Sequence, residues 1–189
     1  MTAAPRDEGR TLWLLRHAKT RSDPPPGRSD FDRVLTPRGR RDATALGRLF
    51  ADKGKGLGPA LAGVLRPAVA LVSPAARTSA TAELVLAEMT DPPEERIVND
   101  LYAAEPDEVL DILRALPDQV GAAMVVAHNP TVQVLSQRLL AHEDAEGQSL
   151  TAQLGFPTCA LAVFRFDTTR WVEVAAGKAT LLALLKPPY

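Results

Sequence analysis

The sequence predicts an α/β fold of three layers, in which a mostly parallel central sheet lies between two layers of helices. Two observations carry this prediction. Short apolar runs of strand length alternate along the chain with segments whose apolar residues recur at helical spacing. The run Ala122–Ala127 is apolar throughout, which is typical of a central strand covered on both faces.

The first strand and the first helix are predicted on either side of a polar loop. The compact apolar run Thr11–Leu15 predicts the strand, and residues 21–34 are polar and rich in proline. Thr36 and Pro37 then predict a helix start, with Thr36 as the N-cap and Pro37 at the first helical position. Glycines over 54–58 end this helix.

The middle of the chain repeats the strand and helix pattern. A short extra helix is expected over 59–66, and the apolar run Val69–Val72 predicts the second strand. Ser73 and the proline after it are expected to cap a helix that runs to about Glu88. A short strand follows near 96–98.

The last third of the chain begins with a helix over 106–116, followed by the apolar strand Ala122–Ala127. Asn129 and Pro130 start the next helix, which carries Leu135 and Leu139. An antiparallel strand is expected near the end of the sheet. Two or three strands are expected to close the chain, at about 159–166, 170–176 and 180–185.

The length of 189 residues suits one α/β domain, which we place at 10–189, with a flexible tail over 1–9. The tail is polar and lacks the apolar run of a signal peptide, and no apolar stretch is long enough to cross a membrane. The expected location is therefore the cytoplasm.

The charge balance excludes several classes of partner. The chain has 22 basic and 23 acidic residues and a net charge of -1, which argues against nucleic-acid binding and membrane-surface binding. With one cysteine, Cys159, and three histidines, the chain has no disulfide within itself and no cysteine cluster for zinc. We expect no metal and no other cofactor.

Chemistry-bearing residues follow three of the predicted strands. Arg16 and His17 come directly after the first strand, Ser73 and Arg77 follow the second, and His128 follows Ala127. Ligands of open α/β sheets bind outside the carboxyl ends of the strands. We therefore expect these side chains to meet at one edge of the sheet, where arginine can bind an anion in a bidentate manner.

Four segments resemble motifs of the histidine phosphatase superfamily, also called the phosphoglycerate-mutase-like superfamily. Leu14-Leu15-Arg16-His17-Ala18 resembles its strand followed by Arg-His-Gly, and Ser73-x-x-x-Arg77-x-x-x-Thr81 its second arginine segment. His128-Asn129-Pro130 resembles its second histidine, and Thr36-Pro37-x-Gly39 the helix start. Within the superfamily, the short length and the segment Arg16-His17-Ala18-Lys19 are most similar to the SixA-like phosphohistidine phosphatases. The resemblance runs from about Thr11 to the 180s and implies a phosphoglycerate-mutase-like fold.

The resemblance also implies the roles of the four central residues. His17 is expected to be the nucleophile, which attacks phosphorus in line and forms a phosphohistidine. Arg16, Arg77 and His128 are expected to surround the phosphoryl oxygens and to stabilise the charge of the transition state. The attacking nitrogen has to be unprotonated, so the other ring nitrogen of His17 should donate to a backbone carbonyl.

Four further positions carry open expectations. Ser73 and Asn129 are candidates for phosphate binding or for support of the catalytic residues, and capping of a helix is an equal alternative for each. Position 18 is Ala where the broad superfamily has Gly, and Ala restricts the backbone conformation there. The resemblance implies that SixA-like members tolerate this residue. Glu105 is the candidate general acid, and its alternative is an acidic residue at a helix start.

Two activities and one non-catalytic role are compatible with these residues. The first is a phosphatase that acts on protein phosphohistidine, whose imidazole leaves without a strong acid. The second is a phosphomonoesterase that acts on a small phosphorylated metabolite or a phosphoprotein and needs a carboxylic acid such as Glu105. The third is a phosphate-binding module without turnover.

Overall fold

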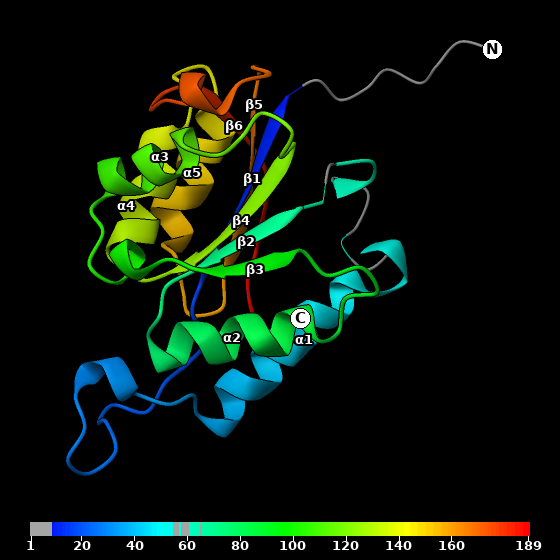
Figure 1. Ribbon diagram of the computed structural model, residues 1–189. Helices are drawn as coiled ribbons and strands as arrows, with labels where there is room; N and C mark the ends of the chain where they lie inside the picture. Colours follow the sequence, from blue (N-terminus) through cyan, green and yellow to red (C-terminus); the bar gives the residue numbers. More distant parts are fainter. Residues whose placement is uncertain (1–8, 55–56, 58–60, 65) are drawn as a thin grey trace.

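The computed structural model describes residues 9–54, 57, 61–64 and 66–189, and its strands form one mixed sheet (Figure 1). The strand order across the sheet is β3-β2-β4-β1-β5-β6. In chain order the strands are β1 (Arg10–Arg16), β2 (Val69–Val72), β3 (Glu94–Ile97), β4 (Ala122–Ala127), β5 (Leu161–Phe166) and β6 (Ala179–Leu185). β3, β2, β4 and β1 pair in parallel, and β5 pairs antiparallel with β1 and β6. The mostly parallel sheet and its antiparallel end are thereby confirmed.

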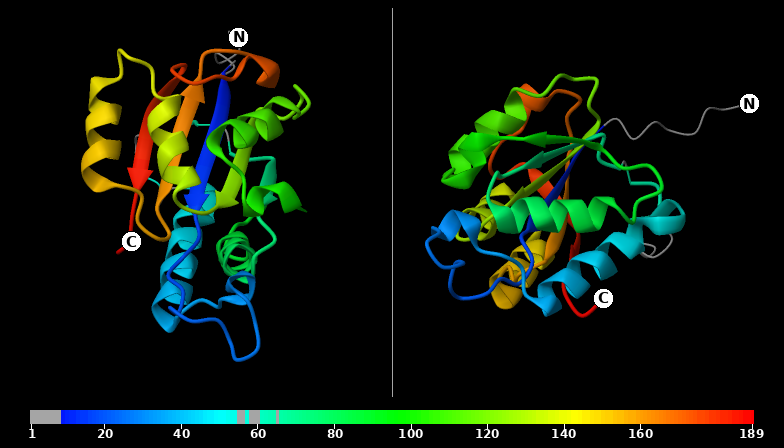
Figure 2. Two further views of the ribbon diagram at one scale, coloured as in Figure 1. Left: turned by 90° about the vertical axis from the view of Figure 1, so that its left-hand side faces the viewer. Right: turned by 60° about the horizontal axis from the view of Figure 1, so that its bottom comes forward.

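Helices cover both faces of this sheet (Figure 2). The α-helices are α1 (Pro37–Gly54), α2 (Ala76–Leu86), α3 (Pro106–Arg114), α4 (Thr131–Leu139) and α5 (Ala145–Leu154). Short 3-10 turns are η1 (Asp30–Asp32), η4 (Asn99–Tyr102) and η5 (Trp171–Glu173). Within the part of the chain described, no helix is both long and apolar enough to cross a membrane.

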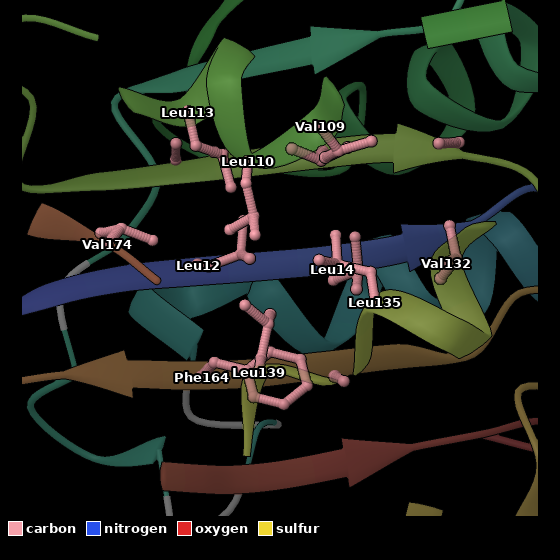
Figure 3. Packing of buried hydrophobic residues seen from close by; sticks show 14 of the residues in the cluster. Leu12, Leu14, Val109, Leu110, Leu113, Val132, Leu135, Leu139, Phe164 and Val174 are labelled. Carbon is pink, nitrogen blue, oxygen red and sulfur yellow. The ribbon is translucent and has the colours of Figure 1, made fainter. Parts of the chain in front are cut away.

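The side chains of β1 alternate between two hydrophobic cores. Leu12 and Leu14 pack with α3 and α4 on one face, and Figure 3 shows this cluster from close by. Trp13 and Leu15 pack with α1 and α2 on the other face. Because successive residues of a strand point to opposite faces, a strand that is apolar throughout is what a three-layer fold requires.

The start of α1 is fixed as the sequence predicts. The Gly39 amide donates to Thr36 Oγ1 at 3.0 Å, so Thr36 caps the helix. The Thr36 amide donates to the Lys19 carbonyl at 2.8 Å, and Thr20 bridges Leu35. These contacts close the base of the polar loop that connects β1 to α1.

The predicted strand over 170–176 is wrong, because this segment contains the turn η5. Trp171 is fully buried and its indole donates to the Val120 carbonyl at 2.5 Å. Its backbone amide donates to Asp118 Oδ1 at 3.0 Å. Burial of one large ring, anchored at both nitrogens, favours a turn here over an extended strand.

α5 is absent from the sequence prediction. Its sequence contains Gly147 and several polar residues and lacks a clear apolar stripe. The helix is held from its start, because Asp144 Oδ1 accepts from the Gly147 amide at 2.9 Å and Asp144 Oδ2 from the Leu181 amide at 2.8 Å. One carboxylate thus caps α5 and joins it to β6.

Two expectations fall wholly or partly outside the described residues. The extra helix expected over 59–66 includes 59–60 and 65, which lie outside, although Leu61 is described and buried. The tail expected over 1–9 lies outside except for Gly9, which is buried and directly precedes β1.

Candidate functional site

The predicted site residues meet at the carboxyl edge of the parallel strands. Arg16, the last residue of β1, is paired in register with Ala127, the last residue of β4. The His17 amide donates to the Ala127 carbonyl at 3.1 Å. His17 and His128 therefore leave neighbouring strands side by side, with ring centroids 5.4 Å apart.

His17 is held with one ring nitrogen free for chemistry. Its Nδ1 lies 2.8 Å from the Ala18 carbonyl oxygen, which can only accept, so Nδ1 carries the proton and Nε2 does not. Burial, together with the positive charges of Arg16 and Arg77, lowers the pKa of His17 to about 4. The imidazole is thus neutral at pH 7, as a nitrogen nucleophile has to be.

His128 is fixed at both ring nitrogens. Arg77 Nε donates to Nδ1 at 3.1 Å, and because a guanidinium cannot accept, the proton of this ring is on Nε2. Nε2 then donates to Ser73 Oγ at 2.7 Å. Burial, followed by the charge of Arg77, lowers the pKa of His128 to about 3. His128 is a neutral hydrogen-bond donor in this arrangement.

Ser73 does not cap α2, so the capping alternative is wrong for this residue. The N-cap of α2 is Ala75, whose conformation is extended and which makes no side-chain cap. The Ser73 hydroxyl is committed to His128, and its amide donates to the Val126 carbonyl at 3.0 Å. Ser73 therefore supports the histidine of the neighbouring strand.

Thr81 ties α2 to the loop that carries His17. The Ala18 amide donates to Thr81 Oγ1 at 2.9 Å, and this hydroxyl donates to the Arg77 carbonyl at 2.6 Å. Ala18 is fully buried and is not among the described residues with a positive φ. An alanine is accommodated at this position because the backbone needs no conformation reserved for glycine.

Arg16 and Asn129 converge on one carbonyl and leave polar atoms unpaired. Arg16 Nη1 donates to the Phe156 carbonyl at 2.6 Å, and Asn129 Nδ2 donates to the same oxygen at 3.2 Å. Arg16 Nε and Asn129 Oδ1 are buried and have no hydrogen-bond partner among the described residues. A buried guanidinium N–H without a partner is a donor available to a phosphoryl oxygen.

Glu105 stands apart from these contacts. It is exposed and is the N-cap residue of α3, and its amide donates to the Glu108 carboxylate at 2.7 Å. This is the position that a helix-start acid takes. The role of general acid stays a prediction.

Several residues near the site went unnoticed in the sequence. Asp30 of η1 forms an ion pair with Arg77, and its other oxygen pairs with Arg33. Phe31 and Tyr102 stack edge to face with centroids 5.1 Å apart, and Tyr102 lies edge to face with His128 at 5.9 Å. Asp30 and Phe31 belong to a polar loop that gives no periodic signal, so only its fold over α2 brings them to the site. Tyr102 reaches the site from η4.

The chain is similar in sequence to known proteins. The Histidine phosphatase superfamily (branch 1) matches over residues 12–98. An uncharacterized protein of Mycobacterium tuberculosis (strain ATCC 25618 / H37Rv) is 32% identical over 178 residues, which cover 92% of this chain and 99% of that protein. One of Mycobacterium leprae (strain TN) is 29% identical over 179 residues, with the same coverage.

Solved structures agree with the family match. A Nakamurella multipartitia protein assigned as the phosphohistidine phosphatase SixA is 31% identical, with a TM-score of 0.72 over 96% of this chain and 98% of that chain. An Agrobacterium tumefaciens protein with the same assignment is 27% identical, with a TM-score of 0.72 over 94% and 98%. The protein histidine phosphatase SixA complexed with tungstate is 23% identical and shares the fold, with a TM-score of 0.69 over 94% and 97%.

Proposed function

The chain belongs to the histidine phosphatase superfamily as a SixA-like hydrolase, and we propose that it removes the phosphoryl group from protein phosphohistidine. The observation that carries this proposal is the unprotonated Nε2 of His17 beside Arg16, Arg77 and His128. The names of the SixA structures support the class of substrate.

The first step is an attack of the His17 Nε2 electron pair on phosphorus, in line with the leaving imidazole. The bond from phosphorus to the substrate nitrogen breaks, and its electron pair stays on the leaving ring. His17 keeps its Nδ1 proton, which it donates to the Ala18 carbonyl, so the positive charge of the phosphorylated ring is stabilised by that hydrogen bond. An imidazole leaves readily, which lowers the need for an acid.

The second step returns the enzyme to its starting state. Water attacks the phosphorylated His17, the bond from phosphorus to Nε2 breaks, and the electron pair returns to Nε2. Both protons of the water leave with the phosphate, as dihydrogen phosphate. In both steps, the unpaired Nε of Arg16 and the guanidinium of Arg77 stabilise the negative charge on the phosphoryl oxygens. The neutral His128 keeps Arg77 in place and supplies a further donor when Ser73 releases it.

The decisive test is the variant His17→Ala. We expect loss of turnover by several orders of magnitude, because the nucleophile is removed and the unprotonated Nδ1 of His128 is already occupied by its hydrogen bond from Arg77. Turnover is measured on a protein phosphohistidine, and the wild type is trapped as an acid-labile, alkali-stable phosphoenzyme. His142→Ala is the matched control, since His142 is an exposed histidine, and it should keep full activity. Full turnover by His17→Ala would refute the mechanism.

The variant Glu105→Gln distinguishes the two classes of substrate. If the protein acts on phosphohistidine, Glu105→Gln should leave turnover within about twofold, because imidazole needs no strong acid. If it is a phosphomonoesterase, the same change should lower ester turnover by about a hundredfold or more. Both substrates are assayed side by side, with Glu108→Gln as the control for the helix cap that the two residues share.

A further inference from the structure

A carboxylate of the protein itself occupies the anion-binding face of Arg77. Arg77 Nη2 lies 3.0 Å from Asp30 Oδ2, and Arg77 Nη1 donates to the Asp30 carbonyl at 2.7 Å. The Arg77 guanidinium, which is expected to bind a phosphoryl group, is therefore paired with the Asp30 carboxylate of η1.

The second oxygen of the same carboxylate binds another arginine. Arg33 Nη1 lies 3.1 Å from Asp30 Oδ1, so each oxygen of one anion is held by a different guanidinium. Arg33 Nη2 donates to Thr20 Oγ1 at 2.5 Å, and its Nε is buried without a partner among the described residues. Arg33 is thus anchored without Asp30 and retains a free donor.

Arg33 also acts on the nucleophile. Its positive charge is among the causes that lower the pKa of His17, together with the charges of Arg16 and Arg77. A charge that influences His17 in this way also attracts an anion bound beside it. Arg33 and Arg77 share the Asp30 carboxylate and therefore form one cationic pair.

The burial of the three partners shows which of them can leave. The side chain of Arg77 is 8% exposed and that of Arg33 26%, whereas that of Asp30 is 56% exposed. Release of Asp30 to water costs little desolvation, whereas release of Arg77 would leave a buried charge without a partner. A phosphoryl group also carries more negative charge than the carboxylate and more oxygens to accept from the same N–H groups.

We propose that Arg33 is a third phosphate-binding arginine. The Asp30 carboxylate occupies the anion-binding position between Arg33 and Arg77 until a phosphoryl group displaces it. Asp30 then moves toward solvent, while the contacts of Thr20 with Arg33 and with Leu35 keep the base of the loop in place. This inference rests on the proposed function for its location and concerns binding, which is independent of turnover.

The test is the equilibrium affinity for inorganic phosphate, measured by calorimetry on the full chain. Asp30→Asn should bind phosphate roughly three- to tenfold more tightly, because the competing charge is gone. Arg33→Gln should bind about tenfold more weakly, because a charge-assisted hydrogen bond is lost. Opposite signs for two partners of one ion pair are the signature of displacement.

Matched controls come from the same loop. Asp32→Asn removes an equal charge two residues from Asp30, where the carboxylate accepts from the Ser29 amide and not from an arginine, and should change affinity less than Asp30→Asn. Arg28→Gln removes an exposed arginine and should have a smaller effect than Arg33→Gln. Circular dichroism checks that each variant is folded.

Each outcome decides the proposal. Weaker phosphate binding by Asp30→Asn would show that Asp30 only positions Arg77, and unchanged binding by Arg33→Gln would remove Arg33 from the site. Either result overturns the inference even if phosphohistidine is hydrolysed normally. Conversely, the predicted affinities together with no turnover of phosphohistidine would overturn the proposed function and leave this inference standing.

Discussion

At the scale of single residues, the two site histidines couple folding to pH. An unfolded histidine has an ordinary pKa of about 6.5, whereas burial lowers the pKa of His17 to about 4 and that of His128 to about 3. Below pH 6.5 the unfolded chain binds protons that the folded chain does not. The free energy of unfolding should therefore decrease as the pH falls from about 6.5 to about 4.

This dependence is measured by urea unfolding at pH 7, 6, 5 and 4. His17→Asn and His128→Asn should each show a shallower decrease than the wild type, because one titrating group is removed. A wild-type slope in His17→Asn would contradict the assignment of a lowered pKa to this residue.

At the scale of elements, the start of α1 depends on a glycine. A Cβ at Gly39 would lie 2.1 Å from the Lys19 carbonyl oxygen and 2.9 Å from the Lys19 carbonyl carbon. Gly39→Ala should separate α1 from the β1–α1 loop and cost about 1–3 kcal/mol of stability, as overpacking does. The hydrogen bond from Thr36 to Lys19 would be strained by the same shift.

Thermal unfolding and phosphate affinity check this prediction together. Because Lys19 follows the site loop of His17 and Ala18, the melting temperature and the affinity should both decrease in Gly39→Ala. Arg40→Ala is the control, because Arg40 is an exposed neighbour in the same helix. An unchanged melting temperature in Gly39→Ala would show that the close approach is not maintained in solution.

Elements with a strong local signal could be predicted from the sequence, and those without it could not. The strand Ala122–Ala127 has its predicted bounds because a continuous apolar run allows few alternatives. α5 lacks an apolar stripe, and it owes its position to the contacts of Asp144 with Gly147 and Leu181. η5 occupies a segment with strand-like composition because Trp171 is buried against Val120.

At the scale of the whole molecule, the sheet order creates the site. β4 lies between β1 and β2, so the segments after these three strands come together although they are far apart in the sequence. Buried leucines and valines on both faces hold the strands in this order. Figure 3 shows the cluster on one of these faces. The catalytic chemistry thus rests on a rigid frame, while Asp30 and Phe31 belong to a loop at its edge.

The sequence by itself determined the fold class and the family, and it predicted Arg16, His17, Arg77 and His128 as the central residues of the site. These follow from local patterns, namely apolar runs and the residues directly after them. Only the tertiary structure decided the hydrogen-bond partners that set the proton positions of His17 and His128, and the commitment of Ser73 to His128. It alone also decided the ion pairs of Asp30, because the path of a polar loop depends on long-range contacts that no local pattern encodes.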